Sequence, residues 1–91
     1  MQTAWVTVLE FWPDYGPGPL WADGKPADLE SLPMGRDLIQ RLTAWNATYS
    51  EDKVPIEGPG DEAWLGEGKR LLREVRDAMD DQHQVVVTEA W

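Results

Sequence analysis

The 91-residue sequence lacks cysteine, has a single histidine (His83), and contains 8 Lys and Arg residues against 17 Asp and Glu residues. Without cysteine, the chain has no disulfide framework, no thiolate metal site and no cysteine nucleophile. Asp80 lies three residues before His83, but two ligands are too few for a metal site, and one histidine has no partner for a nucleophile relay. We therefore expect no metal, no cofactor and a solvent-facing His83.

Long apolar runs are also absent. No stretch is long enough to span a bilayer, and the start, Met1 to Trp5, lacks the basic residues and the apolar run of a signal peptide. We therefore expect a cytoplasmic protein, in which the glycosylation sequon Asn46-Ala47-Thr48 is a chance match. A net charge of −9 repels nucleic acid and anionic membranes, so neither is expected as a direct partner.

Motifs typical of enzymes are missing as well. The segment Gly66 to Lys69 resembles part of a phosphate-binding loop, but Arg70 follows where such a loop needs Ser or Thr. Three acidic pairs suit general acid–base or divalent-metal chemistry; they are Glu51-Asp52, Asp61-Glu62 and Asp80-Asp81. Each pair falls at a predicted helix end, where capping or solvation is the better explanation. We expect that the protein is not an enzyme, with a carboxylate-only hydrolase as the enzymatic alternative.

Two apolar segments near the ends of the chain predict strands. Thr3 to Trp12 is rich in β-branched and aromatic residues and is apolar on both faces, which is typical of a central strand. Gln84 to Ala90 contains three consecutive valines and predicts the second strand. Leu20 to Ala22 predicts a short third strand, because Asp23-Gly24 suits a two-residue hairpin turn and Lys25 begins a very short return.

Two helices are predicted between the end strands. The first runs from about Met34 to about Ser50. Its apolar residues recur at spacings of three and four, which places them on one face; they are Leu38, Leu42, Trp45 and Tyr49. Asp61 is the predicted N-cap of the second helix. The apolar face of that helix consists of Trp64, Leu65, Gly68, Leu71, Leu72, Val75 and Met79.

These elements predict an α+β fold for a single domain, residues 1–91, with the architecture of a two-layer β-α-α-β sandwich. The N- and C-terminal strands are expected to pair in a small antiparallel sheet, with a short hairpin beside them and both helices across one face. Because a sheet of this size leaves an edge to hide, a homodimer through the exposed sheet edge is one expected assembly.

Six tryptophans in 91 residues are the main anomaly of the composition. Trp45 and Trp64 lie on the apolar faces of the predicted helices and are expected in the core. Four other aromatic residues flank loops or chain ends: Trp12, Tyr15, Trp21 and Trp91. These rings either close the open end of a small core or form a partner-binding surface, since tryptophan and tyrosine are enriched among interface hot spots.

Charge is distributed unevenly along the chain. Residues 1–35 carry five acids and one lysine, the last fifteen residues carry four acids and no base, and residues 69–76 carry four bases and one acid. An acidic surface attracts a basic partner and speeds its association. This pattern fits an immunity-type protein that blocks a cationic toxin, or a mimic of nucleic acid. A mimic needs a regular carboxylate array over an extended face, whereas the second predicted helix contains the basic segment. General protein binding is therefore favoured over mimicry.

Six segments of packing and turn residues are spread over most of the chain. They are Leu20 to Gly24, Leu32 to Met34, Leu38 to Leu42, Trp45-Asn46, Trp64-x-x-x-Gly68 and Val85 to Val87. In these segments the sequence resembles small uncharacterised acidic proteins of actinobacteria and their phages. The shared residues are specific to a fold and silent about activity. The resemblance implies a cytoplasmic accessory or phage-encoded protein without a known catalytic site.

Taken together, the sequence predicts a non-enzymatic protein-binding module that binds and inhibits or regulates a host or partner protein. A basic partner is expected if the acidic surface makes the contact. Two alternatives stay open: an immunity-type or nucleic-acid-mimicking inhibitor of a basic protein, and a structural homo-oligomer.

Overall fold

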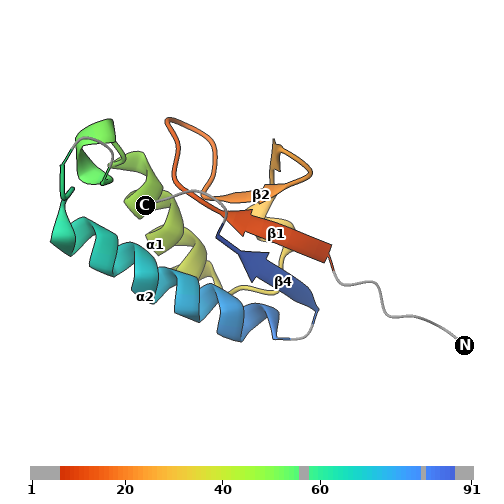
Figure 1. Cartoon of the computed structure of the whole chain (residues 1–91). Helices are drawn as coiled ribbons and strands as arrows, with labels where there is room; N and C mark the ends of the chain where they lie inside the picture. The colour runs from red at the N-terminus through yellow and green to blue at the C-terminus, as the bar shows by residue number, and fades with distance from the viewer. Residues whose placement is uncertain (1–6, 56–57, 81, 88–91) are drawn as a thin grey trace, which may run out of the picture.

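A four-stranded sheet and two long helices form two layers, with both helices on one face of the sheet (Figure 1). The computed structural model describes residues 7–55, 58–80 and 82–87. Its strands are β1 (Thr7–Phe11), β2 (Leu20–Ala22), β3 (Lys25–Pro26) and β4 (His83–Val86). Its helices are α1 (Arg36–Ala47) and α2 (Glu62–Met79), with short 3-10 helices η1 (Leu29–Ser31) and η2 (Glu51–Lys53). The predicted α+β sandwich of a small sheet covered by two helices is confirmed.

The strand order is β3-β2-β1-β4, so the N- and C-terminal strands pair, as predicted, and β1 is central. The predicted antiparallel orientation of that pair is wrong. β1 and β4 run parallel, in a register from Thr7↔His83 to Glu10↔Val86. The reason lies in the connection: α2 carries the chain back to the end of the sheet where β1 begins, so β4 starts beside the start of β1. Side-chain periodicity fixes which residues share a face but not the direction of a strand.

The hairpin is antiparallel, with β2 paired to both β1 and β3. Asp23 and Gly24 have φ angles of 54° and 76° at its turn, the positive values that a two-residue hairpin turn requires. The return strand β3 has two residues, which confirms the prediction of a very short one. Of the predicted end strands, residues 3–6 and 88–90 lie outside the described residues.

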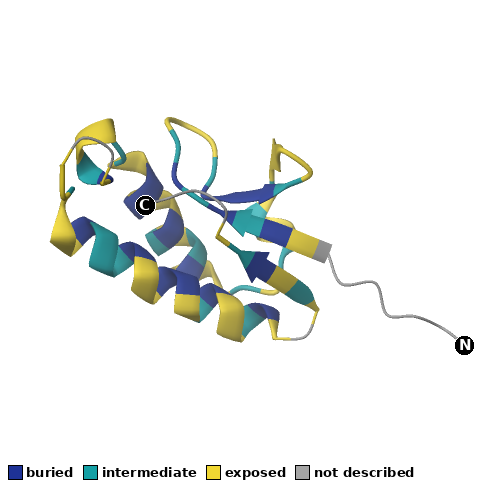
Figure 2. Ribbon diagram, in the orientation of Figure 1, coloured by how far each residue is buried: buried dark blue, intermediate teal, exposed yellow. Residues whose placement is uncertain are grey.

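The faces of the sheet differ. Leu9, Phe11 and Val85 point toward the helices and are buried, whereas Val8 is 49% exposed on the opposite face. The buried side chains of strands and helices form one core (Figure 2), made of Leu9, Phe11, Leu20, Leu38, Leu42, Trp45, Val54, Trp64, Leu71, Leu72, Val75, Met79 and Val85. The helix-facing layer therefore contains the hydrophobic core, and the other face of the sheet contains β-strand residues without a helix over them in Figure 1.

The helices begin and pack much as their sequence patterns predict. Asp61 is the N-cap of α2, where its carboxylate accepts a hydrogen bond of 3.1 Å from the Trp64 backbone N–H. Arg41 of α1 forms a fork of two hydrogen bonds with Glu74 of α2, at 2.7 and 2.6 Å. This ion pair ties the exposed sides of the two helices together while the apolar faces pack beneath it. Neither helix combines the length and the apolarity needed to cross a membrane, within the described part of the chain.

Candidate partner-binding site

Residues 13–19 connect β1 to β2, and we call this segment the Tyr15 loop. Side-chain hydrogen bonds from α1 fix its backbone. Asn46 of α1 supports it from below. The Asn46 side-chain oxygen accepts a hydrogen bond of 3.0 Å from the Asp14 N–H, and its amide nitrogen donates to the carbonyls of Gly16 and Pro17, at 3.2 and 3.0 Å. Asn46 is only 3% exposed. A buried amide with three loop contacts fixes the loop backbone against the helix.

A stacked pair of tryptophans supports the other side of the loop. The rings of Trp12 and Trp21 lie 4.0 Å apart between centroids and are nearly parallel, at 3°. The Trp21 indole N–H donates to the Trp12 carbonyl at 2.9 Å. Gly18 lies against the Trp21 ring, where a Cβ atom would come within 3.1 Å, and has a φ of +107°. Glycine at this position therefore allows both the turn and the close approach.

Tyr15 lies at the tip of the loop with 58% of its surface exposed. Its hydroxyl accepts a hydrogen bond of 3.2 Å from the Glu51 N–H, and its ring meets the Tyr49 ring edge to face at 4.8 Å. The ring centroids of Tyr49 and Trp64 lie 6.0 Å apart in turn. Tyr15 is thus the exposed end of a series of aromatic contacts that leads into the core.

Acidic residues are frequent at the end of the molecule where Tyr15 lies. The Tyr15 loop, η2 and the start of α2 meet at one end of the molecule, because the Lys53 carbonyl accepts a 2.9 Å hydrogen bond from the Asp61 N–H. We define the acidic end by its six residues: Asp14, Tyr15, Glu51, Asp52, Asp61 and Glu62. All are exposed except Asp14, which is half-buried. Lys53 adds one positive charge here, and its ammonium lies 6.0 Å from the centroid of the Trp64 ring.

The electrostatics of this end are visible in Tyr49. Burial raises the pKa of its phenol above the ordinary value of 10.0. Its neighbours Tyr15, Glu51 and Asp14 raise that pKa further, because a second negative charge beside them is unfavourable. The C-terminal end of α1, which carries the negative end of the helix dipole, lies two residues before Tyr49. Because the last turn of α1 has no basic residue, this partial negative charge is not compensated there. The acidic end is therefore a site of negative potential.

The opposite charge is concentrated on α2. We define the basic face by four exposed residues: Lys69, Arg70, Arg73 and Arg76. Two of them have structural contacts. Arg70 pairs with Glu67 at 2.6 Å, and Arg76 donates two hydrogen bonds to the Val85 carbonyl of β4, at 3.2 and 2.9 Å. The basic face thus contains four of the eight Lys and Arg residues of the sequence.

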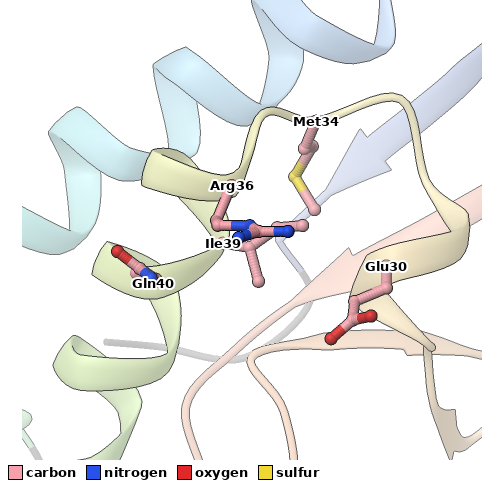
Figure 3. A pocket seen from close by; sticks show the side chains of 5 residues that line it. All are labelled: Glu30, Met34, Arg36, Ile39 and Gln40. Carbon is pink, nitrogen blue, oxygen red and sulfur yellow. The ribbon is translucent and has the colours of Figure 1, made fainter.

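An open groove of about 540 Å³ lies between η1 and the first turns of α1 (Figure 3). Its lining residues are Glu30, Met34, Arg36, Ile39 and Gln40. Figure 3 shows Arg36 and Ile39 close together below Met34, with Glu30 on the opposite side. The lining contains no nucleophile–base pair. Across residues 7–55, 58–80 and 82–87, no three His, Cys, Asp or Glu side chains lie close enough to hold a metal ion.

Comparison with known protein families places the chain. The model of the Serratia CdiI immunity protein-like family matches residues 7–90, nearly the whole length. The chain belongs to this family. No curated protein matches the chain. Membership in an immunity protein-like family agrees with the predicted protein-binding role and with the immunity-type alternative, while an actinobacterial or phage origin stays a prediction.

For this family member, the structure separates the four aromatic residues predicted to bind a partner. Tyr15 is exposed and Trp12 is half-buried, so both reach the surface. Trp21 is only 5% exposed, because Trp12 and Gly18 cover its ring. The ring is therefore buried and supports the loop from behind, as closure of a small core would require, and a role of Trp21 in partner binding stays a prediction. Trp91 lies outside the described residues.

His83 also differs from the expectation. It is half-buried at the start of β4 rather than solvent-facing, and its Nδ1 atom is buried without a hydrogen-bond partner among the described residues. His83 begins β4 and pairs with Thr7 of the central strand β1, so it lies within the sheet rather than in an exposed turn. Asp80, which the sequence analysis excluded as a metal ligand together with His83, is exposed.

Sequence reasoning missed Asn46, which organises the site. It was set aside as part of a chance sequon, yet it holds the Tyr15 loop through three hydrogen bonds. A signal was present: Asn46 lies four residues after Leu42 and beside Trp45, on the apolar face of the helix. A polar residue among buried ones requires hydrogen-bond partners, and these had to come from a neighbouring segment.

Proposed function

We propose that this protein is an immunity protein that binds a toxin and blocks it without catalysing a reaction. The observation that carries this proposal is the match of the immunity protein-like family to residues 7–90. The net charge of −9 supports a basic partner, since an acidic surface accelerates association with a cationic protein. A cytoplasmic site of action, expected from the sequence, is part of the proposal.

The tasks of the carboxylates support a binding role over an enzymatic one. Asp61 caps α2, Asp14 accepts a hydrogen bond of 2.8 Å from the Tyr15 N–H, and the Asp52 carboxylate accepts one from the Ser50 hydroxyl. General acid–base catalysis by two carboxylates requires a pair that faces a common substrate. These three side chains instead stabilise turns and helix ends, and they leave a charged outer surface.

Two other readings receive less support. A nucleic-acid mimic needs carboxylates over an extended face, whereas the longest helix presents the basic face. A homo-oligomer through the edge of β4 would need free backbone groups there, and one of them, the Val85 carbonyl, already accepts two hydrogen bonds from Arg76. Capture of a toxin by side chains of an acidic surface is the simpler account of both features.

The test uses the purified full chain and a purified candidate toxin domain from the same organism. Mixed in equal amounts, the two should elute as one complex, with a mass by light scattering equal to one copy of each. The toxin's activity should fall to background at the same ratio. A chain that leaves both the toxin's activity and its elution unchanged would contradict the proposal, and a chain that is dimeric alone would favour the homo-oligomer.

A further inference from the structure

Tyr15 combines exposure with immobility. Among the described residues, it is the most exposed large hydrophobic side chain, at 58%. Its ring is nevertheless held at two points, by the hydrogen bond from the Glu51 N–H to its hydroxyl and by the edge-to-face contact with Tyr49. A tyrosine that is already ordered loses little side-chain entropy on binding, which is the property of interface hot spots.

The backbone below Tyr15 is fixed in the same way. Asn46 holds the loop on the helix side, and the stack of Trp12 on Trp21 holds its base. Both the Asn46 hydrogen bonds and the tryptophan stack act on the backbone of the loop. Their common effect is to present the loop tip in one conformation, so a partner would meet a preformed surface.

The charges around the exposed ring specify the partner's chemistry. Two acidic residues contact Tyr15: the Asp14 carboxylate accepts a hydrogen bond from the Tyr15 N–H, and the backbone N–H of Glu51 donates to the Tyr15 hydroxyl, with Asp52 next in the chain. An arginine side chain suits a site with an exposed ring and nearby carboxylates better than a lysine does. Its planar guanidinium stacks on an aromatic face, and its fork of N–H groups binds carboxylates. The surface thus offers a ring for stacking and carboxylates for the hydrogen bonds.

We propose that the Tyr15 loop is the toxin-contacting surface of this protein, and that it takes an arginine from a cationic segment of the toxin. The guanidinium stacks on the exposed ring of Tyr15, and Asp14 and Glu51 accept its N–H groups. This inference rests on the proposed immunity function and adds the surface and the partner's chemistry to it.

The other surfaces fit a cationic partner less well. The basic face of α2 would repel it. The groove between η1 and α1 has Glu30 and Arg36 on its rim, so its charges offset each other. The sheet face around Val8 offers apolar contact and a single half-buried carboxylate in β1, that of Glu10, fewer than the acidic end presents. Binding through any of these surfaces would leave the affinity of Tyr15 and Glu51 variants unchanged.

The experiment measures the dissociation constant for the toxin domain used in the test above, at low and at moderate salt. The variants are Tyr15→Ala, Glu51→Gln and the matched control Asp77→Asn, which removes an exposed carboxylate from α2. Tyr15→Ala should weaken binding by at least about 30-fold, the size of an interface hot spot. Glu51→Gln should weaken it several-fold and flatten the salt dependence, and Asp77→Asn should bind like the wild type.

Two results separate the failure of this inference from the failure of the proposed function. If the wild type blocks the toxin but Tyr15→Ala and Glu51→Gln bind equally well, the surface lies elsewhere and the inference is overturned while the function stands. If the wild type neither binds nor blocks the toxin, both fail. Circular dichroism confirms that each variant is folded, and because Glu51→Gln changes one exposed side chain, it keeps the test decisive if Tyr15→Ala is unstable.

Discussion

The molecule contains two stacked tryptophan pairs in very different settings. Trp45 and Trp64 lie 4.3 Å apart between α1 and α2, and each indole N–H donates to the backbone carbonyl of the other, at 2.9 and 3.2 Å. Trp12 and Trp21 lie 4.0 Å apart at the base of the Tyr15 loop, with a single such hydrogen bond. The first pair joins the two helices inside the core, and the second supports a surface loop.

The difference shows that one residue type has two tasks here. The reciprocal hydrogen bonds of Trp45 and Trp64 satisfy both indoles, so the pair can be buried at 4% and 7% exposure. In the pair at the loop, Trp12 stays half-buried, and the stack packs at the base of the loop that contains Tyr15. We therefore expect changes at the helix interface to reduce stability, and changes at the loop to reduce toxin binding more than stability.

The largest effect should follow Trp64→Ala. It removes a buried ring from the core together with the hydrogen bonds to Trp45 and Thr48. We expect a loss of about 3–5 kcal/mol in the free energy of unfolding, measured by urea denaturation. Trp12→Ala is the matched change in the other pair and should cost clearly less. Equal losses for the two variants would erase the distinction between the pairs.

A smaller effect is expected for Asn46→Ala. The substitution leaves the Asp14 N–H and the carbonyls of Gly16 and Pro17 without their partner, at a cost of about 1–3 kcal/mol. Amide hydrogen exchange in the Tyr15 loop should become faster, while exchange in α2 should change little. Asn46→Asp keeps the acceptor but turns a buried carboxylate oxygen toward the carbonyls of Gly16 and Pro17, so at neutral pH it should destabilise the loop at least as much as Asn46→Ala. Unchanged exchange in the loop would show that Asn46 does not order it.

Tyr49 connects the two regions and predicts an alkaline limit to stability. Because its pKa is raised above 10.0 in the folded protein, the folded state holds the phenolic proton more tightly than the unfolded state does. This contribution is complete below pH 10 and is lost as the pH rises through the folded pKa. Thermal denaturation between pH 8 and 12 should therefore show a smaller decline for Tyr49→Phe than for the wild type. Parallel curves would mean that the phenol does not contribute.

The smallest effect concerns the exposed ion pair between the helices. The hydrogen bonds from Arg41 hold the pKa of Glu74 below its ordinary value of 4.5. Its contribution to stability is present above pH 4.5 and is lost as the pH falls through the folded pKa. Glu74→Gln should slightly lower the melting temperature at pH 7 and reduce the decline on acidification, and Arg41→Gln should do the same. If only one of the two variants behaves in this way, the pair is not the cause.

The sequence predicted much of the fold because periodic patterns report on burial. The apolar faces of both helices, the Asp61 cap and the Asp23-Gly24 turn all follow from local chemistry. The direction of β4 did not, because it depends on the path that α2 takes between the end strands.

The candidate site was only partly accessible from the sequence, for a similar reason. The exposure of Tyr15 could be predicted, because an aromatic residue in a loop of Pro, Gly and Asp has few ways to become buried. The burial of Trp21 could not, because it depends on a loop that folds back over the ring. Asn46 was missed because its partners lie about 30 residues away, and such contacts appear only once the chain is folded.

The central claim is that the acidic end, and not the basic face of α2, meets the toxin. Amide NMR spectra of the labelled protein, recorded while the toxin domain is added, test it most directly. The account predicts that the largest shifts fall in residues 13–19 and 51–53 and at the start of α2. Shifts concentrated in residues 69–76, with the Tyr15 loop unchanged, would contradict it.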